Sequence, residues 1–474
     1  MQMELTASQR SNVQMNFEIS NFGYIKQGKV TTQPLTVFCG RNNTGKTWVM
    51  YAIYGILHGL SLETPLPGLS GISQALQQEG SVDFDLINWL DKEFASIQLC
   101  LNNAINKRLP DILNATSAFF EKTDFKINLD LDNIKQNVIL AGAKTLGRDK
   151  SIHANLLFSV EKSKNDGVLR LELFNDQTKK ASVPNASFDV FISIFLIDLI
   201  FGSNAPYRPF LLPSERTGLH LLFKELSIRR TNLLHLSRSN EANLSGLLKN
   251  IARYAEPVAH YINWLNQLSV GTDTSTEKNQ DLLLPLDSII GGAYRIDKEG
   301  DISFLTDASE FPIELHLTSS TVNSLAGLWF YIKYWDQNEK TLMIDEPELN
   351  LHPANQRALA RLLARLVNKG IRVIISTHSD YLIREINSLI MLSQEHPQRA
   401  DLMEKYGYSE AEILKPEQVG AYLFDKNSIQ TMEVSQDEGI IATTFDEVIN
   451  DLNETSDDIF YTYRHWNKQA GDAA

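Results

Sequence analysis

The sequence is poor in cysteine, with only Cys39 and Cys100 in 474 residues. Two cysteines are too few for a disulfide framework or a cysteine-based zinc site, and they suit a reducing cytoplasm. The first 20 residues lack the pattern of a signal peptide. Long apolar runs are also missing: the most apolar stretch, residues 188–202, contains two aspartates and predicts a buried helix. We therefore expect a cytoplasmic protein without a membrane partner.

Positive charge is scarce as well, because 44 lysines and arginines face 58 aspartates and glutamates, for a formal net charge of -14. An acidic chain repels nucleic acid on average, so contact with DNA would need a local basic patch or a partner. The densest basic run contains Lys224, Arg229, Arg230 and Arg238. We interpret this run as the solvated face of a helix.

Against this plain composition, residues 40–47 fit the pattern G-x-x-x-x-G-K-[ST] at every fixed position. A short β-branched run precedes the segment and an apolar helical pattern follows it, which is the strand–loop–helix context of a phosphate-binding loop. We expect Lys46 to reach the β- and γ-phosphates of ATP and Thr47 to hold Mg²⁺. The predicted nucleotide contacts are Gly40, Arg41, Asn42, Asn43, Thr44, Gly45, Lys46, Thr47 and Trp48.

A phosphate loop needs a carboxylate for Mg²⁺ and a group that positions water. The apolar run at 341–344 ends in Asp345 and Glu346, and we expect Asp345 in the metal shell and Glu346 as general base. A helical pattern and a second apolar run follow, and His378 ends that run. This order predicts that His378 contacts the γ-phosphate, so Lys46, Glu346 and His378 are the candidate catalytic residues.

The segment "DEPELNLHP" followed by "ISTHSDYLI" resembles the ABC-type ATPase head shared by SMC-like repair proteins, RecF-like proteins and the overcoming-lysogenization-defect (OLD) family. The resemblance implies that Asp345 is the Walker B aspartate, Glu346 the catalytic glutamate and His378 the switch histidine. It also implies that residues 348–352 form the D-loop.

Such heads hydrolyse ATP as dimers, in which a signature helix from one subunit caps the nucleotide of the other. Residues 316–335 have the matching position, with a Ser/Thr cluster before an apolar helix. Aligned on the family's Leu-Ser-Gly-Gly-Gln, the match is residues 317–321, without either glycine. We expect Thr318, Ser319 or Ser320 to contact the γ-phosphate, and a plain helix N-cap is the alternative.

The gap between the two groups of motifs, about 300 residues, exceeds what a compact P-loop domain needs. Hairpins are predicted at 153–186 and 291–305, and an amphipathic helix at 83–109 that Pro110 interrupts. The fold class is therefore α/β: an ABC-type P-loop ATPase head with a mainly parallel sheet, an antiparallel β-subdomain and a helical insertion. The expected segments are 12–60 (head, P-loop), 61–205 (helical insertion, β-hairpin), 206–290 (PSER segment, helices), 291–385 (head, signature to switch histidine) and 386–474 (strands, helical tail).

The strand–turn–helix pattern at 210–223 contains Pro-Ser-Glu-Arg and resembles a segment of defence-associated ATPases close to the OLD family. Arg216 is expected to face the nucleotide or the dimer partner, and a helix cap with Ser214 is the alternative. No Toprim or HNH metal motif is apparent in the sequence. The chain therefore resembles the ATPase subunits of anti-phage systems such as Septu and PARIS.

In those systems a homo-oligomeric ATPase controls a separate HNH or Toprim effector. A phage protein or DNA as trigger is part of the same expectation. Two alternatives remain open from the sequence. One is a RecF-like or SMC-like repair ATPase that clamps DNA, and the other is a nucleotide-gated interaction protein with little turnover.

Overall fold

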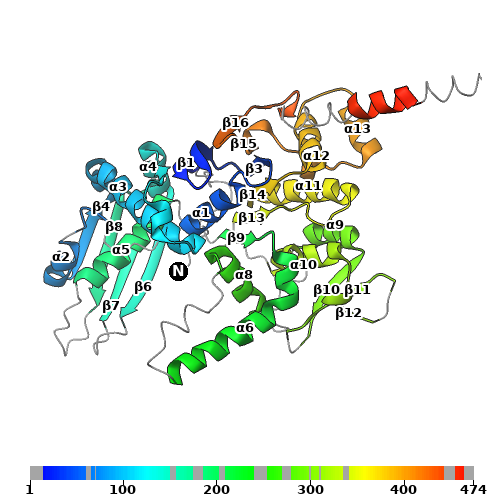
Figure 1. The fold of residues 1–474 in the computed structure, drawn as a ribbon. Coiled ribbons are helices and arrows are strands. Elements are labelled where there is room, and N and C mark those ends of the chain that lie inside the picture. Colours follow the sequence, from blue (N-terminus) through cyan, green and yellow to red (C-terminus); the bar gives the residue numbers. More distant parts are fainter. Residues whose placement is uncertain are drawn as a thin grey trace, which may run out of the picture.

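A computed structural model describes most of the chain and shows four β-sheets surrounded by helices (Figure 1). The described residues are 14–59, 66–69, 71–149, 156–174, 185–201, 209–239, 254–268, 279–297, 300–308, 311–334, 341–441 and 454–463. Among them, no helix is long and apolar enough to cross a membrane.

The largest sheet has nine strands and combines segments from both ends of the chain. Five of its eight neighbouring pairs are parallel, which makes it mainly parallel. In spatial order the strands are β5 (Asp124–Asn128), β1 (Asn16–Phe22), β2 (Ile25–Thr31), β16 (Ser428–Met432), β15 (Val419–Asp425), β3 (Leu35–Gly40), β14 (Arg372–Thr377), β13 (Thr341–Asp345) and β9 (Pro209–Leu212).

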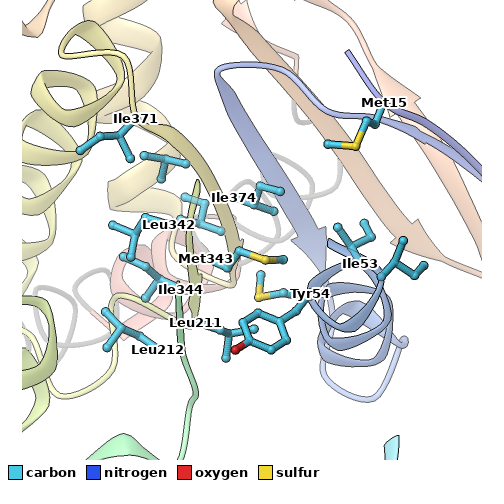
Figure 2. Close-up of a cluster of buried hydrophobic side chains, with 14 of the residues drawn as sticks. Met15, Ile53, Tyr54, Leu211, Leu212, Leu342, Met343, Ile344, Ile371 and Ile374 are labelled. Carbon is cyan, nitrogen blue, oxygen red and sulfur yellow. The ribbon is translucent and has the colours of Figure 1, made fainter. Parts of the chain in front are cut away.

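The parallel strands are apolar because both of their faces are covered. β13 is buried along its whole length, and β3 and β14 are buried at all but one position each. Figure 2 shows these strands running between α1 on one side and other helices on the other, with Met343 among the buried side chains. Fully burying such a side chain contributes about 1.5–3 kcal/mol, so these strands form a rigid base for the loops at their carboxyl ends.

Twelve labelled α-helices and one further helical segment lie in the described residues. The labelled helices are α1 (Lys46–His58), α2 (Ile72–Glu79), α3 (Leu86–Leu113), α4 (Leu131–Leu140), α5 (Asn185–Ile200), α6 (Arg216–Ser239), α8 (Glu256–Leu265), α9 (Gln280–Ile290), α10 (Ser320–Tyr334), α11 (Pro353–Asn368), α12 (Asp380–Met391) and α13 (Arg399–Tyr406). Residues 454–463 are also helical. The buried apolar helix expected at 188–202 corresponds to α5.

Three smaller sheets accompany the central one. Both predicted hairpins are confirmed, as the antiparallel pairs β7–β8 and β10–β11. The sheets are β4 (Ser81–Asp85), β8 (Val168–Phe174), β7 (Leu156–Lys162) and β6 (Ala143–Asp149); β10 (Gly292–Ile296), β11 (Ile302–Thr306) and β12 (Ile313–Glu314); and β17 (Val434–Ser435) and β18 (Gly439–Ile440).

The helix expected at 83–109 has different ends in the structure. Its first residues form strand β4, and Asp85 caps the helix by accepting hydrogen bonds from the amides of Ile87 and Asn88. The helix then runs through Pro110 to Leu113. Pro110 lies in the last turn, where the chain leaves the helix at Asn114, so the interruption predicted there is wrong. The five segment boundaries stay a prediction, although β5 and β9 from the middle of the chain join the central sheet.

Candidate functional site: a phosphate loop facing two carboxylates

The phosphate loop leaves the carboxyl end of β3 and enters α1 at Lys46. Gly40 has a φ of 136° and Gly45 a φ of 99°, both in the region that favours glycine. A Cβ at Gly40 would lie 2.3 Å from the carbonyl oxygen of Phe424, so the neighbouring strand β15 allows no side chain there. The local sequence therefore has a backbone reason for both glycines of the motif.

Lys46 is 5% exposed, and its ammonium group donates to the carbonyl oxygens of Gly40 and Arg41 at 3.0 and 2.8 Å. Burial lowers the pKa of Lys46 from its usual value, and the carboxylates of Glu346 and Asp345 act against that shift. The ammonium therefore lies against the loop that would hold the phosphates. Phosphate oxygens would be stronger acceptors for it than these two carbonyl oxygens.

The two candidate metal ligands, Thr47 and Asp345, lie together at the N-terminal end of α1. The Thr47 hydroxyl donates to a carboxylate oxygen of Asp345 at 3.0 Å, although 298 residues separate the two in sequence. The Ser376 hydroxyl also hydrogen bonds to Asp345. Hydroxyl and carboxylate oxygens are the ligands that Mg²⁺ prefers, so this pair fits the ion. The Asp345 carboxyl is 0% exposed, and burial raises its pKa.

The raised pKa of Asp345 gives a first prediction, because the folded protein without nucleotide favours the neutral carboxyl. As the pH rises above 3.8, the ordinary pKa of this carboxyl, the unfolded chain ionises Asp345 more readily than the folded protein does. The free energy of unfolding of wild type therefore falls relative to that of a variant with a neutral side chain. Asp345→Asn is therefore expected to stabilise the nucleotide-free protein by about 1 kcal/mol near pH 7, with the gain shrinking toward pH 4. Thermal unfolding without Mg²⁺ at both pH values measures it. A less stable Asp345→Asn protein near neutral pH would contradict the prediction.

Glu346 follows the strand in a left-handed conformation, with a φ of 49°, which asparagine and glycine adopt more readily. Its amide donates to the carbonyl and hydroxyl oxygens of Ser376, both at 3.1 Å. The Glu346 carboxylate lies 3.5 Å from Nε2 of His378, with side chains 29% and 28% exposed. The hydrogen bond to His378 lowers the pKa of Glu346. The carboxylate is therefore ionised and accessible to water, as a general base requires.

Glu348 is a member of the site that sequence reasoning placed only in the D-loop. Its Oε1 accepts a hydrogen bond from the His378 amide at 2.6 Å, and burial raises its pKa. Glu348 thus fixes the backbone of the switch-histidine candidate. The signal for it in the sequence was its place in "DEPE", two residues after Glu346, but nothing local named His378 as its partner.

Arg216 has a role that the sequence did not predict. Its side chain is 2% exposed and donates to four carbonyl oxygens, at 2.8–3.0 Å. The acceptors belong to Pro213, Ser324, Asp345 and Glu346. Arg216 therefore holds the end of β13 and the helix α10 together. The expectation that it faces the nucleotide or a dimer partner is wrong in this structure, because its donors point at backbone inside the protein.

The proposed signature cluster lies at the start of α10. Ser319 and Ser320 are exposed and Thr318 is half-buried. The Thr318 hydroxyl donates to the carbonyl oxygen of Leu315, and the Ser319 hydroxyl oxygen accepts from the amide of Val322 at 3.3 Å. The N-cap alternative thus has a geometric basis, while the exposed hydroxyls leave a contact with a second subunit open. Both interpretations stay predictions.

The remaining loop residues differ in what their side chains contact. Arg41, Asn42 and Asn43 are exposed, and the Thr44 hydroxyl donates to the carbonyl of Arg41 at 2.9 Å. The Trp48 ring packs against aromatic residues outside the loop, namely Phe22, Tyr24 and Phe119. Their nucleotide contacts stay predictions.

In the basic run, Lys224 pairs with Asp301 at 2.5 Å. The side chains of Arg229, Arg230 and Arg238 lie outside what the structure describes.

Together the mainly parallel sheet and the loop at its carboxyl edge define a P-loop fold of the α/β class. A family model described as "AAA ATPase domain" matches residues 15–190 and 216–383. The match covers more than half of the chain, so the chain belongs to this family. No curated protein matches the sequence significantly.

Solved structures of three SMC heads are similar to this chain. One is an Smc head bound to the C-winged helix domain of ScpA, with 12% identity over 89% of this chain and 97% of that chain, and a TM-score of 0.33. An SMC head domain from Thermotoga maritima has 11% identity, coverages of 89% and 99%, and a TM-score of 0.31. The third is an Smc head with an extended coiled coil bound to the C-terminal domain of ScpA, derived from Pyrococcus furiosus, with 13% identity, coverages of 93% and 98%, and a TM-score of 0.31.

Proposed function

We propose that the chain binds ATP with Mg²⁺ and hydrolyses it, using Lys46, Thr47, Asp345, Glu346 and His378. The observation that carries this proposal is the 3.0 Å contact between the Thr47 hydroxyl and Asp345. It brings together the phosphate loop and the carboxylate-bearing strand, the two elements whose side chains would hold Mg²⁺ beside the phosphates of ATP. Membership of the AAA ATPase domain family supports the same activity.

The chemistry assigned to each residue follows from its position. Lys46 and the backbone amides of residues 40–47 bind the phosphates and stabilise their charge. Thr47 and Asp345 would hold Mg²⁺, which neutralises the charge developing on the β- and γ-phosphate oxygens. Glu346 accepts a proton from the attacking water, and the neighbouring His378 orients that carboxylate and reaches toward the γ-phosphate.

Lys46→Ala tests the site most directly. Removal of the ammonium is expected to lower the rate of ATP hydrolysis by about 10²–10³-fold, because the γ-phosphate loses its charged donor. Phosphate release by the purified chain, alone and with duplex DNA, measures it. Unchanged turnover would place the activity elsewhere, whereas stimulation by DNA would favour the clamp function over a protein trigger.

We further propose that the ATPase acts as a homo-oligomer and controls a separate nuclease-type effector in anti-phage defence. Support for this finer role comes from the resemblance of residues 210–223 to a segment of defence-associated ATPases. Residues 345–353 resemble the ATPase head that the OLD family shares with SMC-like and RecF-like proteins. The exposed Ser319 and Ser320 at the start of α10 suit a contact between two heads. Co-purification with the products of neighbouring genes tests the idea. A chain that binds none of them and protects cells alone would contradict it.

A further inference from the structure

A second cluster of chemically active side chains lies at the opposite end of the P-loop helix. His58 is the last residue of α1, about 18 Å along the helix from Lys46 at 1.5 Å per residue. Glu256 and His260 lie one turn apart on α8. One ligand atom from each of these three residues lies within 4.8 Å of the other two. Figure 1 shows α8 next to α1, outside the edge of the central sheet at which β9 lies.

The distances within this cluster are close to those of a metal site. Nδ1 of His58 and Nε2 of His260 lie 3.7 and 4.0 Å from the same carboxylate oxygen of Glu256. A tetrahedral zinc ion with bonds of about 2.0–2.2 Å separates its ligand atoms by about 3.3–3.6 Å. Small side-chain rotations therefore suffice to bring both imidazoles and the carboxylate to coordination distance.

Neighbouring groups hold Glu256 and His260 in place. Arg108 on α3 donates to both oxygens of Glu256 at 3.1 and 3.3 Å, and also to the carbonyl of Gly55 on α1. The Tyr54 hydroxyl lies 3.0 Å from Nδ1 of His260, which leaves Nε2 directed at Glu256. Metal-bound histidines usually carry such a partner on their second nitrogen, and ligating carboxylates are themselves hydrogen bonded.

We propose that His58, Glu256 and His260 bind one divalent transition-metal ion of the zinc class, with water as a fourth ligand. Two imidazoles and one carboxylate favour zinc or a similar ion over Mg²⁺, which prefers oxygen ligands. The ion has a path of entry, because the side chains of His58 and His260 are 35% and 32% exposed. The bound ion would join the end of α1 to α8. Its binding does not depend on ATP hydrolysis.

The location gives the ion a structural consequence. Tyr261, next to His260, hydrogen bonds through its hydroxyl to His220 on α6, and His220 contacts Asn323 on α10. A metal that fixes α8 therefore also steadies the buried polar link to the helix with the proposed signature cluster. Because the ion binds only when α1 and α8 meet, its binding stabilises the folded chain.

Cobalt titration of the full chain, freed of metal and without nucleotide, tests the site. Tetrahedral Co²⁺ reports its binding by visible absorption, and we expect one equivalent that Zn²⁺ displaces. His58→Ala and His260→Ala should each weaken Co²⁺ binding by about 100-fold or more, and Tyr54→Phe by about 10–100-fold. Zn²⁺ should raise the midpoint of thermal unfolding of wild type. It should leave unchanged the midpoint of His58→Ala, a substitution at an exposed position.

Two matched variants separate this site from other histidines and from the ATPase centre. His396→Ala removes an exposed imidazole that accepts a hydrogen bond from the nearby amide of Gln398, and Asp345→Asn removes the other candidate divalent site. Both should keep the cobalt spectrum. Wild type without a tetrahedral spectrum, or equal affinity in wild type, His58→Ala and His260→Ala, would overturn the proposal. Loss of the spectrum in Asp345→Asn alone would also overturn it.

Discussion

Glu346→Gln is expected to lower the turnover of ATP by about 10²–10⁴-fold while ATP binding is kept. Glutamine has nearly the shape of glutamate and can still accept a hydrogen bond from His378, 3.5 Å away in wild type. It cannot take a proton from water. Binding and chemistry should therefore separate, and if heads pair on ATP, the paired form should accumulate. Phosphate release, ATP binding and the mass in solution with Mg²⁺ and ATP measure the three parts.

Glu348→Gln is the matched control, because it changes a carboxylate of the same turn. Glu348 accepts from the His378 amide, and the oxygen of glutamine can keep that bond. Its loss of activity should stay within about tenfold, the scale of a perturbed hydrogen bond. If Glu348→Gln were the inactive variant and Glu346→Gln remained within threefold of wild type, the assignment of the general base to Glu346 would be wrong.

The parts of the site predictable from sequence are those that local backbone geometry determines. The strand, loop and helix around residues 35–58 follow from two glycines that must adopt positive φ and from the apolar runs beside them. The strands that end at Asp345 and Thr377 are recognisable as short apolar runs. The motifs predicted that Thr47 and Asp345 serve one Mg²⁺ site, and the hydrogen bond between them brings the two side chains together.

The parts that sequence could not predict depend on contacts between distant segments. Arg216 reaches carbonyls 108 and 129 residues away, and a backbone acceptor has no side-chain signature. Its "PSER" context predicted the turn but not the partners. The cluster of His58 and His260 needs α1 and α8 to pack together, so the two histidines looked unrelated in sequence. The predicted end of the helix at 83–109 is wrong, because proline is tolerated in a last helical turn that packing holds in place.

Arg216→Ala is expected to destabilise the protein by about 3–5 kcal/mol. The guanidinium is buried, and its loss leaves four carbonyl oxygens without their donors. Such acceptors cost about 1–3 kcal/mol each when they stay unpaired in the interior, and partial relaxation reduces the sum. Arg216→Lys should be intermediate, because an ammonium lacks the planar fork that reaches several carbonyls at once. Urea unfolding of the nucleotide-free protein measures the midpoint shifts.

Arg170→Ala provides the contrast, because Arg170 also makes a paired contact, with Asp83, but on the surface, with side chains 59% and 55% exposed. Its loss should shift the unfolding midpoint far less than the loss of Arg216, because an exposed ion pair contributes little to stability. Equal effects of the two alanine variants would contradict the bridging role of Arg216. Activity adds a second readout, because Arg216 fixes the carbonyl of Glu346 at 2.8 Å and that of Ser324 on α10 at 3.0 Å. An Arg216→Ala protein that folds at low temperature should therefore bind ATP but hydrolyse it slowly, because the backbone of Glu346 is no longer fixed by Arg216.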